Sequence, residues 1–360
     1  MAPPRVALMM LSLVPGAMGG GETFLRALTS GLDRTVVDAT AYVPANARGF
    51  CDGVPEVVIE DVAGGPSNVQ RLRAAVTGSV LGRRIRKQMV RPDVVHYPLT
   101  SAFPSMPDSV GKIVSLHDLA HLELPQNFPW AERVYRRIAY EAPAKRADLV
   151  LTLSEHARAG IIERVGIPPE RVRTIHLGVN LDRFTPGDRP RENFLLYPAR
   201  PYPHKNHELL IDAVRELRLE DPDLRLVLTG EGLERLGDLP DWVERKGLVS
   251  LDELERLYHT ARLMVFPSLF EGFGLPPLEA MAAGCPVASS DAASLPEVLE
   301  GAAELFDAHS AESIADGVRR ALGRTDELVA LGLERVQDTG WDSCLRAHEQ
   351  AYLDVAAMRS

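Results

Sequence analysis

Residues 267–287 read PSLFEGFGLPPLEAMAAGCPV, and this stretch carries the local signals that decide the fold. The apolar run just before it, which ends at Phe266, is typical of a buried strand. The glycines of EGFG let the backbone approach a ligand closely, and Pro276 or Pro277 suits the first turn of a helix. Gly284 then favours the end of that helix. The stretch therefore predicts a strand, a glycine-rich loop and a short helix, in that order.

Two glutamates lie in this predicted loop and helix. Glu279 falls in or near the first turn of the helix, beside backbone N–H groups that have no partner within a helix. Glu271 falls on the loop before it. Ionised carboxylates accept strong hydrogen bonds from neighbouring hydroxyls. The simpler interpretation is that Glu279 complements the helix dipole and that Glu271 is a solvated loop residue.

The composition of the chain limits the classes of protein to which it can belong. Its length of 360 residues exceeds the size at which one hydrophobic core keeps growing, so about two domains are expected. A net charge of −10 disfavours nucleic-acid binding, which depends on clustered Lys and Arg. The three cysteines are widely spaced and form no CxxC pair, which fits a reducing cytoplasm better than a disulfide framework or a zinc site. No apolar run approaches the roughly 20 residues that span a bilayer, so any membrane contact is expected to be peripheral.

Short apolar runs alternate with helical patterns, which is typical of βα units. In the first half, the predicted buried strands are Val6–Leu11, Val94–Val95, Ile113–Leu116, Leu149–Leu153 and Ile175–Leu177. In the second half, they are Phe194–Tyr197, Leu226–Leu228 and Met264–Phe266. Between the halves, Phe184–Arg191 has the composition of an exposed linker, so the domains are predicted to be 1–185 and 186–340. We expect an α/β protein with two doubly wound, Rossmann-like domains that face each other across a cleft.

Three further segments combine glycine or charged residues with the predicted ends of strands. YPARPYPHKNHELL, at 197–210, places Arg200 and Lys205 at the first strand-to-helix turn of the second domain. PGAMGGGETF, at 15–24, is glycine-rich but is not G-x-G-x-x-G, which disfavours a dinucleotide dehydrogenase. VSLHDLAHLELPQNF, at 114–128, places His117 directly after a buried strand. The simpler interpretations are that Arg200 and Lys205 are solvated, that the glycine-rich segment is a tight turn without a ligand, and that His117 is a structural histidine.

Residues 267–287 resemble the E-x7-E signature of family 4 retaining glycosyltransferases of the GT-B fold. Similar segments extend over nearly the whole chain: RPDVVHYP at 91–98, ADLVLTLSEHAR at 147–158, IHLGVNLDRFTP at 175–186 and LVLTGEG at 226–232. The HDL that begins at His117, followed by P-x-x-F, resembles the branch that contains bacterial mannosyltransferases of polysaccharide biosynthesis. The last segment, within 341–360, resembles the family's helix that crosses back onto the N-terminal domain.

The resemblance implies roles for individual residues. Glu279 would bind the ribose hydroxyls of a nucleotide-sugar donor, and Glu271 would bind hydroxyls of the transferred sugar. Arg200 and Lys205 would stabilise the departing diphosphate, so that neither a metal nor another cofactor is expected. His117 would lie near the donor sugar. The remaining implied contacts to the donor are backbone groups at Gly20, Gly21, Gly230, Leu248, Val249, Phe273, Gly274 and Leu275.

The function that follows from the resemblance is retaining, metal-independent transfer of a hexose in the cytoplasm or at the inner face of the membrane. The first expectation is mannose from GDP-mannose, transferred to a hydroxyl of a glycan, a glycolipid or a small molecule. The alternatives are a UDP-sugar donor, a catalytically silent partner in glycan assembly and a nucleotide-sugar epimerase. A glycosidase, whose two carboxylates lie about 5 to 9.5 Å apart, would have no use for Arg200 and Lys205.

Two other features of the sequence have competing explanations. Asp221-Pro-Asp223 superficially resembles the D-x-D metal motif of the other major glycosyltransferase fold, but its place before Leu226–Leu228 predicts a helix-to-strand loop. Basic residues of the first domain could attract it to anionic lipid that carries an acceptor, although a solvated face is the commoner explanation. These residues are Arg71, Arg73, Arg83, Arg84, Arg86, Lys87, Arg133, Arg136 and Arg137.

Overall fold

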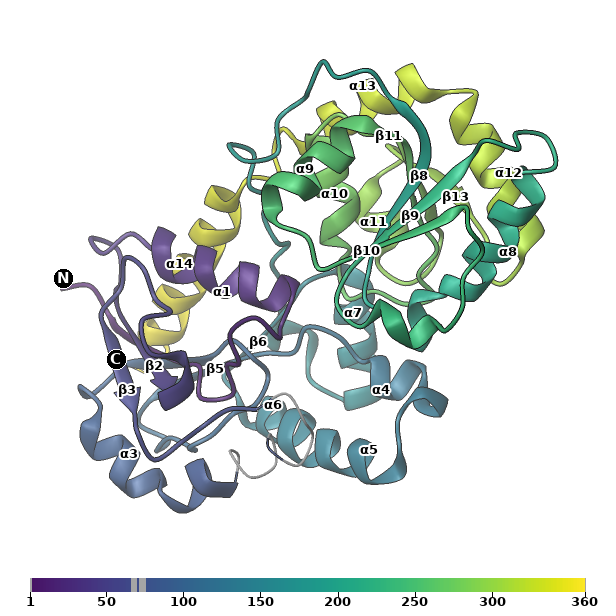
Figure 1. Ribbon diagram of the computed structural model, residues 1–360. Coiled ribbons are helices and arrows are strands. Elements are labelled where there is room, and N and C mark those ends of the chain that lie inside the picture. The colour runs from purple at the N-terminus through teal and green to yellow at the C-terminus, as the bar shows by residue number, and fades with distance from the viewer. Residues whose placement is uncertain (1, 66–69, 71–75, 360) are drawn as a thin grey trace. The chain divides into compact units, whose positions relative to one another are not determined.

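The structure is a computed structural model that describes residues 2–65, 70 and 76–359 (Figure 1). The chain forms two compact units, one that runs to Gly178 and resumes at Trp341, and one that spans Val179–Gly340. The division at Gly178 falls before the linker at which we expected the first domain to end. Gly178 has no room for a side chain, because a Cβ there would lie 2.5 Å from the Cα of Trp341. The two places where the chain crosses between the units are therefore adjacent.

The first unit contains a parallel sheet of seven strands among the described residues, in the order β3-β2-β1-β4-β5-β6-β7. The strands are β1 (Arg5–Met9), β2 (Asp38–Pro44), β3 (Glu56–Ile59), β4 (Val94–Tyr97), β5 (Gly111–Ser115), β6 (Leu149–Thr152) and β7 (Val172–Thr174). The predicted strand Ile175–Leu177 is wrong. Ile175 and Leu177 are buried and apolar, as in a strand, but the pairing of β7 with β6 ends at Thr174.

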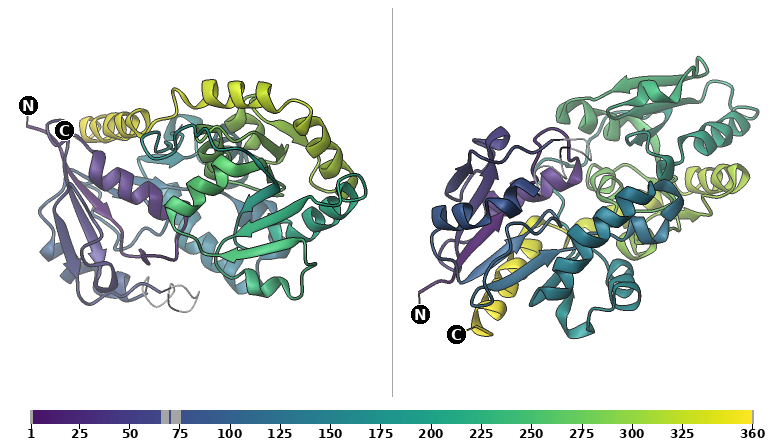
Figure 2. Two further views of the ribbon diagram at one scale, coloured as in Figure 1. Left: turned by 45° about the horizontal axis from the view of Figure 1, so that its top comes forward. Right: turned by 90° about the horizontal axis from the view of Figure 1, so that it is seen from below.

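Helices of the first unit connect these strands and pack on the sheet (Figure 1). They are α1 (Gly20–Gly31), α3 (Gly82–Gln88), α4 (Ala120–Glu123), α5 (Trp130–Arg136), α6 (Ala142–Arg146), α7 (Glu155–Gly160) and α14 (Trp341–Ala357). Two π-helical segments, Arg137–Glu141 and Ile161–Val165, continue α5 and α7. The C-terminal α14 lies beside α1, as the yellow and purple ribbons of Figures 1 and 2 show. Its Tyr352 hydroxyl lies 2.8 Å from Nδ1 of the buried His96 on β4.

The second unit repeats the architecture with six parallel strands in its described part, ordered β10-β9-β8-β11-β12-β13. The strands are β8 (Glu192–Pro198), β9 (Arg225–Thr229), β10 (Val243–Gly247), β11 (Ala261–Phe266), β12 (Val287–Ser290) and β13 (Glu304–Phe306). The helices are α8 (His207–Leu217), α9 (Leu251–Thr260), α10 (Leu275–Ala282), α11 (Leu295–Leu299), α12 (Ala311–Leu322) and α13 (Thr325–Val336). Figure 1 shows α8 and α12 on one face of this sheet and α9 and α10 on the other. The strand order reverses between β8 and β11, which is where ligands of such sheets bind.

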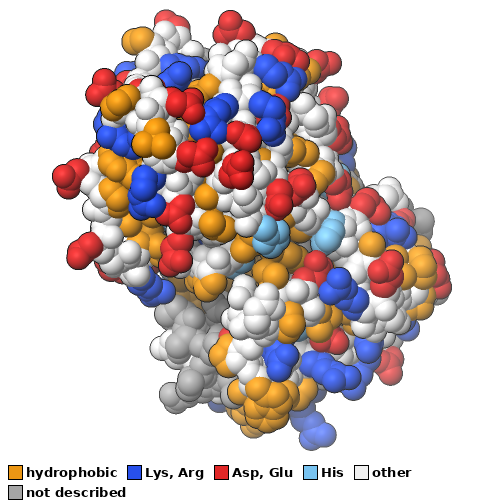
Figure 3. All heavy atoms as spheres, turned by 90° about the vertical axis from the view of Figure 1, so that its right-hand side faces the viewer, with side chains coloured by type: hydrophobic (Ala, Val, Ile, Leu, Met, Phe, Trp, Pro, Cys, Tyr) orange, Lys and Arg blue, Asp and Glu red, His pale blue; other side chains and the backbone are white. Residues whose placement is uncertain are grey.

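Acidic and basic side chains are interspersed over the face of the molecule that Figure 3 shows. Several of the basic residues considered for membrane contact already have partners. Arg84 pairs with Asp61 at 3.3 Å, and Arg86 donates to the carbonyl of Ser105 at 2.8 Å. Arg71 and Arg73 lie outside the described residues. Among the helices that the structure describes, none is long and apolar enough to cross a membrane.

Candidate functional site

The strand order of the second sheet brings the two charged motifs together. Lys205 follows β8 and Glu271 follows β11, and these strands are neighbours in the sheet. The ammonium of Lys205 forms an ion pair with the carboxylate of Glu271, and the two side chains are only 17% and 14% exposed. The backbone N–H of Leu269 donates to the carbonyl of His204 at 2.7 Å, which ties the two loops together. A cation and a carboxylate are thus held next to each other at the point where the strand order reverses.

The backbone around Lys205 is fixed on both sides. The buried hydroxyl of Tyr197 donates to the carbonyl of Lys205 at 2.7 Å. Asn206 adopts a left-handed conformation with φ of 61°, and its side-chain amide donates to the carbonyls of Pro267 and Ala308 at 3.2 and 2.7 Å. The loop therefore holds Lys205 in place through buried hydrogen bonds.

Arg200 lies on the same loop and forms an ion pair with Glu231 at 2.6 Å. Gly230 precedes that glutamate, and the fold itself explains why it is a glycine. Its φ is 140°, and a Cβ would lie 2.7 Å from the carbonyl oxygen of Ala199. The loops after β8 and β9 approach each other too closely there for any other residue. The predicted contact between Gly230 and a nucleotide remains a prediction.

The predicted strand, glycine loop and helix of residues 267–287 are confirmed. Gly274, with φ of 103°, precedes α10, prolines occupy its first turn, and Gly284 adopts a left-handed conformation just after it. The hydroxyl of Ser294 donates to the carbonyls of Glu271 and Phe273 at 3.0 Å each. This buried serine therefore fixes the loop that leads to Leu275, where the backbone N–H groups of a helix start can bind an anion.

Glu279 is the fifth residue of α10 and so lies directly after the first turn, in agreement with the prediction that it falls in or near that turn. The helix begins at Leu275, directly after Gly274, and the two prolines lie in its first turn. The hydroxyl of Tyr258 donates to Oε2 of Glu279 at 3.4 Å. Burial raises the pKa of Glu279 from 4.5 to about 7, because the loss of solvent outweighs this hydrogen bond. The carboxyl therefore changes protonation state near neutral pH.

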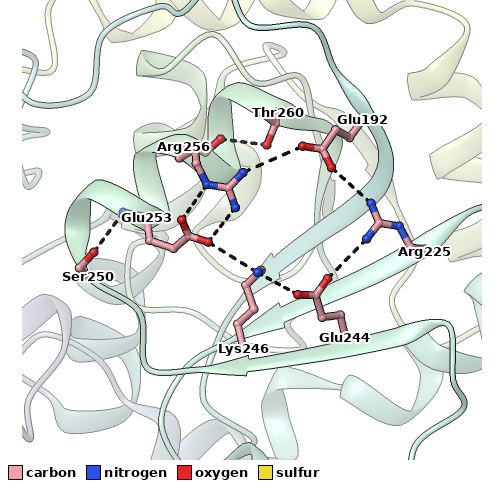
Figure 4. A network of polar contacts seen from close by, with 8 residues as sticks. All are labelled: Glu192, Arg225, Glu244, Lys246, Ser250, Glu253, Arg256 and Thr260. Carbon is pink, nitrogen blue, oxygen red and sulfur yellow. Dashed lines mark hydrogen bonds and ion pairs between the residues drawn. The ribbon is translucent and has the colours of Figure 1, made fainter.

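Leu248 and Val249 lie on the loop between β10 and α9, where Leu248 is largely exposed. A closed ring of six charged side chains of alternating sign connects β10 with α9 (Figure 4). Its members are Glu192, Arg225, Glu244, Lys246, Glu253 and Arg256, and successive members lie 2.7 to 4.0 Å apart. The hydroxyl of Ser250 also accepts from the N–H of Glu253 at 3.2 Å and caps α9. The loop that carries Leu248 is thus held at both ends.

Gly20 and Gly21 are the first two residues of α1 and do not lie on the loop before it. A Cβ at Gly20 would meet no atom of the described residues within 4 Å, so packing alone does not require a glycine there. The preceding loop is closed by Glu22, whose carboxylate accepts from the N–H of Gly16 at 2.6 Å. The open space beside Gly20 leaves the start of this helix accessible to a ligand.

His117 lies just beyond β5 in the first unit. Its Nε2 lies 2.7 Å from the carbonyl oxygen of Pro98, so Nε2 carries the proton and donates. Its Nδ1 is buried and has no hydrogen-bond partner within the part of the chain that the structure describes. The pKa of His117 lies below 6.5, chiefly because the ring is buried, so the neutral form predominates near pH 7. Nδ1 then offers a lone pair to a hydroxyl.

Asp118 and Asp221 have structural partners. The carboxylate of Asp118 accepts from the N–H of Ala120 at 3.0 Å at the start of α4. Asp221 lies in the loop between α8 and β9, as predicted, and accepts from Arg262 at 2.9 Å. In the described ranges, no group of three or more His, Cys, Asp or Glu side chains could hold a metal ion.

Some residues that shape the site were not predicted from the sequence. Tyr258, Ser294 and Glu231 each contact a predicted residue, but no motif identifies them. Tyr258 and Ser294 come from other strand-helix units, so only the fold brings them to Glu279 and Glu271. Glu231 follows Gly230 directly in LVLTGEG, and that acidic position was the one available signal.

Comparison with known proteins agrees with the observed fold. A family model described as Glycosyltransferase Family 4 matches residues 18–183, and one described as Glycosyl transferases group 1 matches residues 179–332. The O-antigen chain mannosyltransferase B of Escherichia coli is 28% identical in an alignment 269 positions long, which covers 67% of this chain and 69% of that protein.

Solved structures show the same fold over the whole chain. Sucrose-phosphate synthase from Thermosynechococcus elongatus has a TM-score of 0.79 at 21% identity and covers 99% of this chain and 100% of its own. HepE from Anabaena, in complex with UDP and glucose, has a TM-score of 0.72 at 16% identity and covers 97% and 99%. With two tandem family models that span residues 18–332 and a glycosyltransferase fold in both units, the chain belongs to the family 4 glycosyltransferases of the GT-B fold.

Proposed function

We propose that this glycosyltransferase moves a hexose from a nucleotide-sugar to a hydroxyl of a glycan, a glycolipid or a small-molecule acceptor, with retention of anomeric configuration and without a metal ion. The observation that carries the proposal is the ion pair of Lys205 with Glu271 at the point of strand reversal in the second sheet, with Arg200 on the same loop as Lys205. Two cations and a carboxylate there suit a ligand that combines a diphosphate with hydroxyl groups.

The diphosphate is assigned to Arg200, Lys205 and the first backbone N–H groups of α10. A departing nucleoside diphosphate accumulates negative charge as the glycosidic bond breaks. Fixed cations that interact more strongly with the leaving group than with the intact donor accelerate this step. Because Tyr197 and Asn206 hold the Lys205 loop in place, little reorganisation is needed when the charge develops.

The hydroxyl groups of the donor are assigned to the two glutamates of the E-x7-E motif. Glu271 would accept from hydroxyls of the transferred sugar while it remains paired with Lys205. Glu279 would accept from the ribose, and Leu248 and Val249 would contact the base through their backbone. His117 of the first unit would accept from a substrate hydroxyl through Nδ1. Front-face transfer, in which the departing phosphate takes the acceptor's proton, would require no further base.

Mannose from GDP-mannose is the first candidate donor. It is supported by the HDL segment at His117 and by the similarity to a mannosyltransferase of Escherichia coli. The alternative is a UDP-sugar, which the similarity to HepE in complex with UDP and glucose favours. A position at the inner face of the membrane stays a prediction.

Thermal stabilisation by GDP-, UDP-, ADP- and dTDP-sugars tests the donor site. A donor present at about 100 times its Kd stabilises the folded protein by about 2.7 kcal/mol, which raises Tm by several degrees. Lys205→Ala and Glu279→Ala should lose this shift, whereas Lys145→Ala, an exposed lysine of the first unit, should keep it. Stabilisation by no nucleotide-sugar would contradict the proposal and favour a silent partner.

Product analysis separates transfer from the competing activities. Incubation with donor and an oligosaccharide should yield an α-linked product from an α-linked donor, as measured by the anomeric coupling constant in NMR spectra. Release of a free sugar from simple glycosides without nucleotide would favour a glycosidase. Conversion of the donor to its epimer without an acceptor would favour an epimerase.

A further inference from the structure

A pocket of about 290 Å³ opens in the first unit, separate from every residue assigned to the donor. Its walls come from α4, from the short 3-10 helix Pro125–Asn127 that follows it, and from α5 with its π-helical continuation. The helix α4 starts shortly after His117, beyond the carboxyl end of β5. That edge of a parallel sheet is where substrates bind.

Two arginines of the pocket are available to bind an anion. Arg133 and Arg137 lie one helical turn apart, so they project from the same side of the helix, and both are exposed. No acidic side chain of the described residues pairs with either of them. Arg136, between them, is instead paired with Glu132 at 2.8 Å and lies over the ring of Phe128 at 4.4 Å. Two adjacent guanidinium groups match the oxygens of a phosphate.

The pocket is also lined by His121, whose buried imidazole can accept a hydrogen bond from a ligand. His121 is 2% exposed, and its Nε2 lies 3.2 Å from Oε1 of Glu141, which is also buried. Since a carboxylate accepts, Nε2 carries the proton. Nδ1 is buried and finds no hydrogen-bond partner among the residues described, and burial lowers the pKa of His121. In the neutral ring Nδ1 is an acceptor, and a hydroxyl of a ligand would satisfy it.

The apolar part of the wall includes Trp130, which is 72% exposed, and Val134. An exposed indole next to arginines is also typical of a helix that lies on a membrane. However, a membrane surface would leave the buried acceptor of His121 unsatisfied. A ligand with a flat apolar face and polar edges, such as a sugar ring, would pack on the indole of Trp130 and donate a hydrogen bond to Nδ1 of His121.

We propose that this pocket binds a phosphorylated sugar, with the phosphate on Arg133 and Arg137, the sugar ring against Trp130 and a sugar hydroxyl on Nδ1 of His121. The proposal rests on the proposed function and deepens it, because it assigns the acceptor to the class of phosphorylated sugars. A free sugar phosphate and a phosphosugar within a glycan share this chemistry.

Titration calorimetry with mannose 6-phosphate tests the pocket without any donor, and mannose and inorganic phosphate serve as reference ligands. The wild-type protein should bind mannose 6-phosphate more tightly than either reference. The double variant R133Q/R137Q should bind it about tenfold more weakly or worse. The matched control R146Q, which removes an exposed arginine of α6 outside the pocket, should bind as the wild type does.

H121Q distinguishes the sugar contact from the phosphate contact. Glutamine places an amide near the position of Nε2 and can still donate to Glu141, but it removes Nδ1. Binding of mannose 6-phosphate should weaken in H121Q while binding of inorganic phosphate stays unchanged. If H121Q folds poorly, the exposed arginine variants still decide the proposal.

Three results would overturn the proposal. They are the absence of saturable binding by the wild type, equal affinities of the wild type and R133Q/R137Q, and equal binding of inorganic phosphate and mannose 6-phosphate. Arginine-dependent binding to vesicles of phosphatidylcholine and phosphatidylglycerol in equal amounts, without binding of mannose 6-phosphate, would assign the surface to a membrane instead.

A transfer assay then identifies the source of the phosphosugar. Transfer to mannose 6-phosphate itself supports a free acceptor, and transfer only to an oligosaccharide that carries the phosphosugar supports a glycan. Donor binding in the second unit is measured separately by thermal shift. Donor stabilisation without mannose 6-phosphate binding would refute the pocket alone, whereas the reverse result would refute the donor site alone.

Discussion

Glu279→Gln should stabilise the donor-free protein while it weakens the binding of the donor. The carboxyl of Glu279 is partly buried, and its one described hydrogen-bond partner is Tyr258 at 3.4 Å. Burial disfavours the ionised form, which is why the pKa rises from 4.5 to about 7. Glutamine keeps the shape and the acceptor oxygen but cannot ionise, so it removes this penalty.

The size and the pH range of the effect follow from the pKa. Below pH 4.5 the carboxyl is protonated in the folded and the unfolded protein, so E279Q and wild type should be equally stable. As the pH rises towards 7, the unfolded protein ionises first, and the folded protein loses stability relative to the variant. Each pH unit corresponds to about 1.4 kcal/mol. Above pH 7 the advantage of E279Q should therefore reach up to about 3 kcal/mol.

Urea unfolding at several pH values between 4.5 and 8.5 measures this difference. Glu312→Gln, at an exposed position in the first turn of α12, is the matched control, and it should change the free energy of unfolding by less than about 1 kcal/mol. A difference between E279Q and wild type that stays constant with pH, or that has the opposite sign at pH 8, would refute the reasoning.

Donor binding should respond in the opposite direction. An ionised carboxylate accepts a stronger hydrogen bond than an amide does, and such bonds contribute about 1.5–3 kcal/mol. E279Q should therefore raise the Kd for the donor about tenfold or more at pH 8, as measured by titration calorimetry. If Glu279 only supported the fold, its substitution would not make the protein more stable and at the same time weaken donor binding.

Four further predictions concern the charged groups and His117. K205A should slow transfer by about 10²–10³-fold and destabilise the protein because Glu271 loses its partner, and K205A/E271Q should recover the melting temperature but not the turnover. H117Q, whose amide can still donate to the carbonyl of Pro98, should keep the melting temperature while kcat falls about tenfold. R256Q should lower the free energy of unfolding in urea by about 1 kcal/mol at low salt and by less at high salt, because it opens the ring of charges. Turnover should survive EDTA if Arg200 and Lys205 are the groups that stabilise the leaving diphosphate, and a loss that Mg²⁺ restores would contradict this assignment.

The doubly wound architecture could be predicted because each βα unit carries its own local signal. A buried parallel strand is a short apolar run, and residues such as Gly284 mark the ends of helices. The same reasoning failed at Ile175–Leu177, because a buried loop can be as apolar as a strand. Only the pairing of β7 with β6 shows where that ladder ends.

The pairing of Lys205 with Glu271 could be expected only in outline. The rule for strand reversal places both loops at one edge of the sheet, but it does not predict that the two side chains form an ion pair. The contact of Tyr258 with Glu279 and the contacts of Ser294 with the EGFG loop depend on how helices pack on the sheet. The pocket of His121 was missed because its residues have ordinary spacing for a surface helix.

The two glutamates of one motif differ in their surroundings, and this difference fits the separate roles proposed for them. Glu271 is compensated by the cation of Lys205, so its charge can be held next to the reacting groups in the folded protein. Among the described residues, the carboxyl of Glu279 has a hydrogen bond only from the neutral hydroxyl of Tyr258, and its ionised form is disfavoured until a ligand supplies further donors. Hydroxyl groups on the ribose would supply them, so binding of the donor should lower the pKa of Glu279 and release a proton near pH 7. The charge that makes the free protein less stable is then the one that makes the complex tighter.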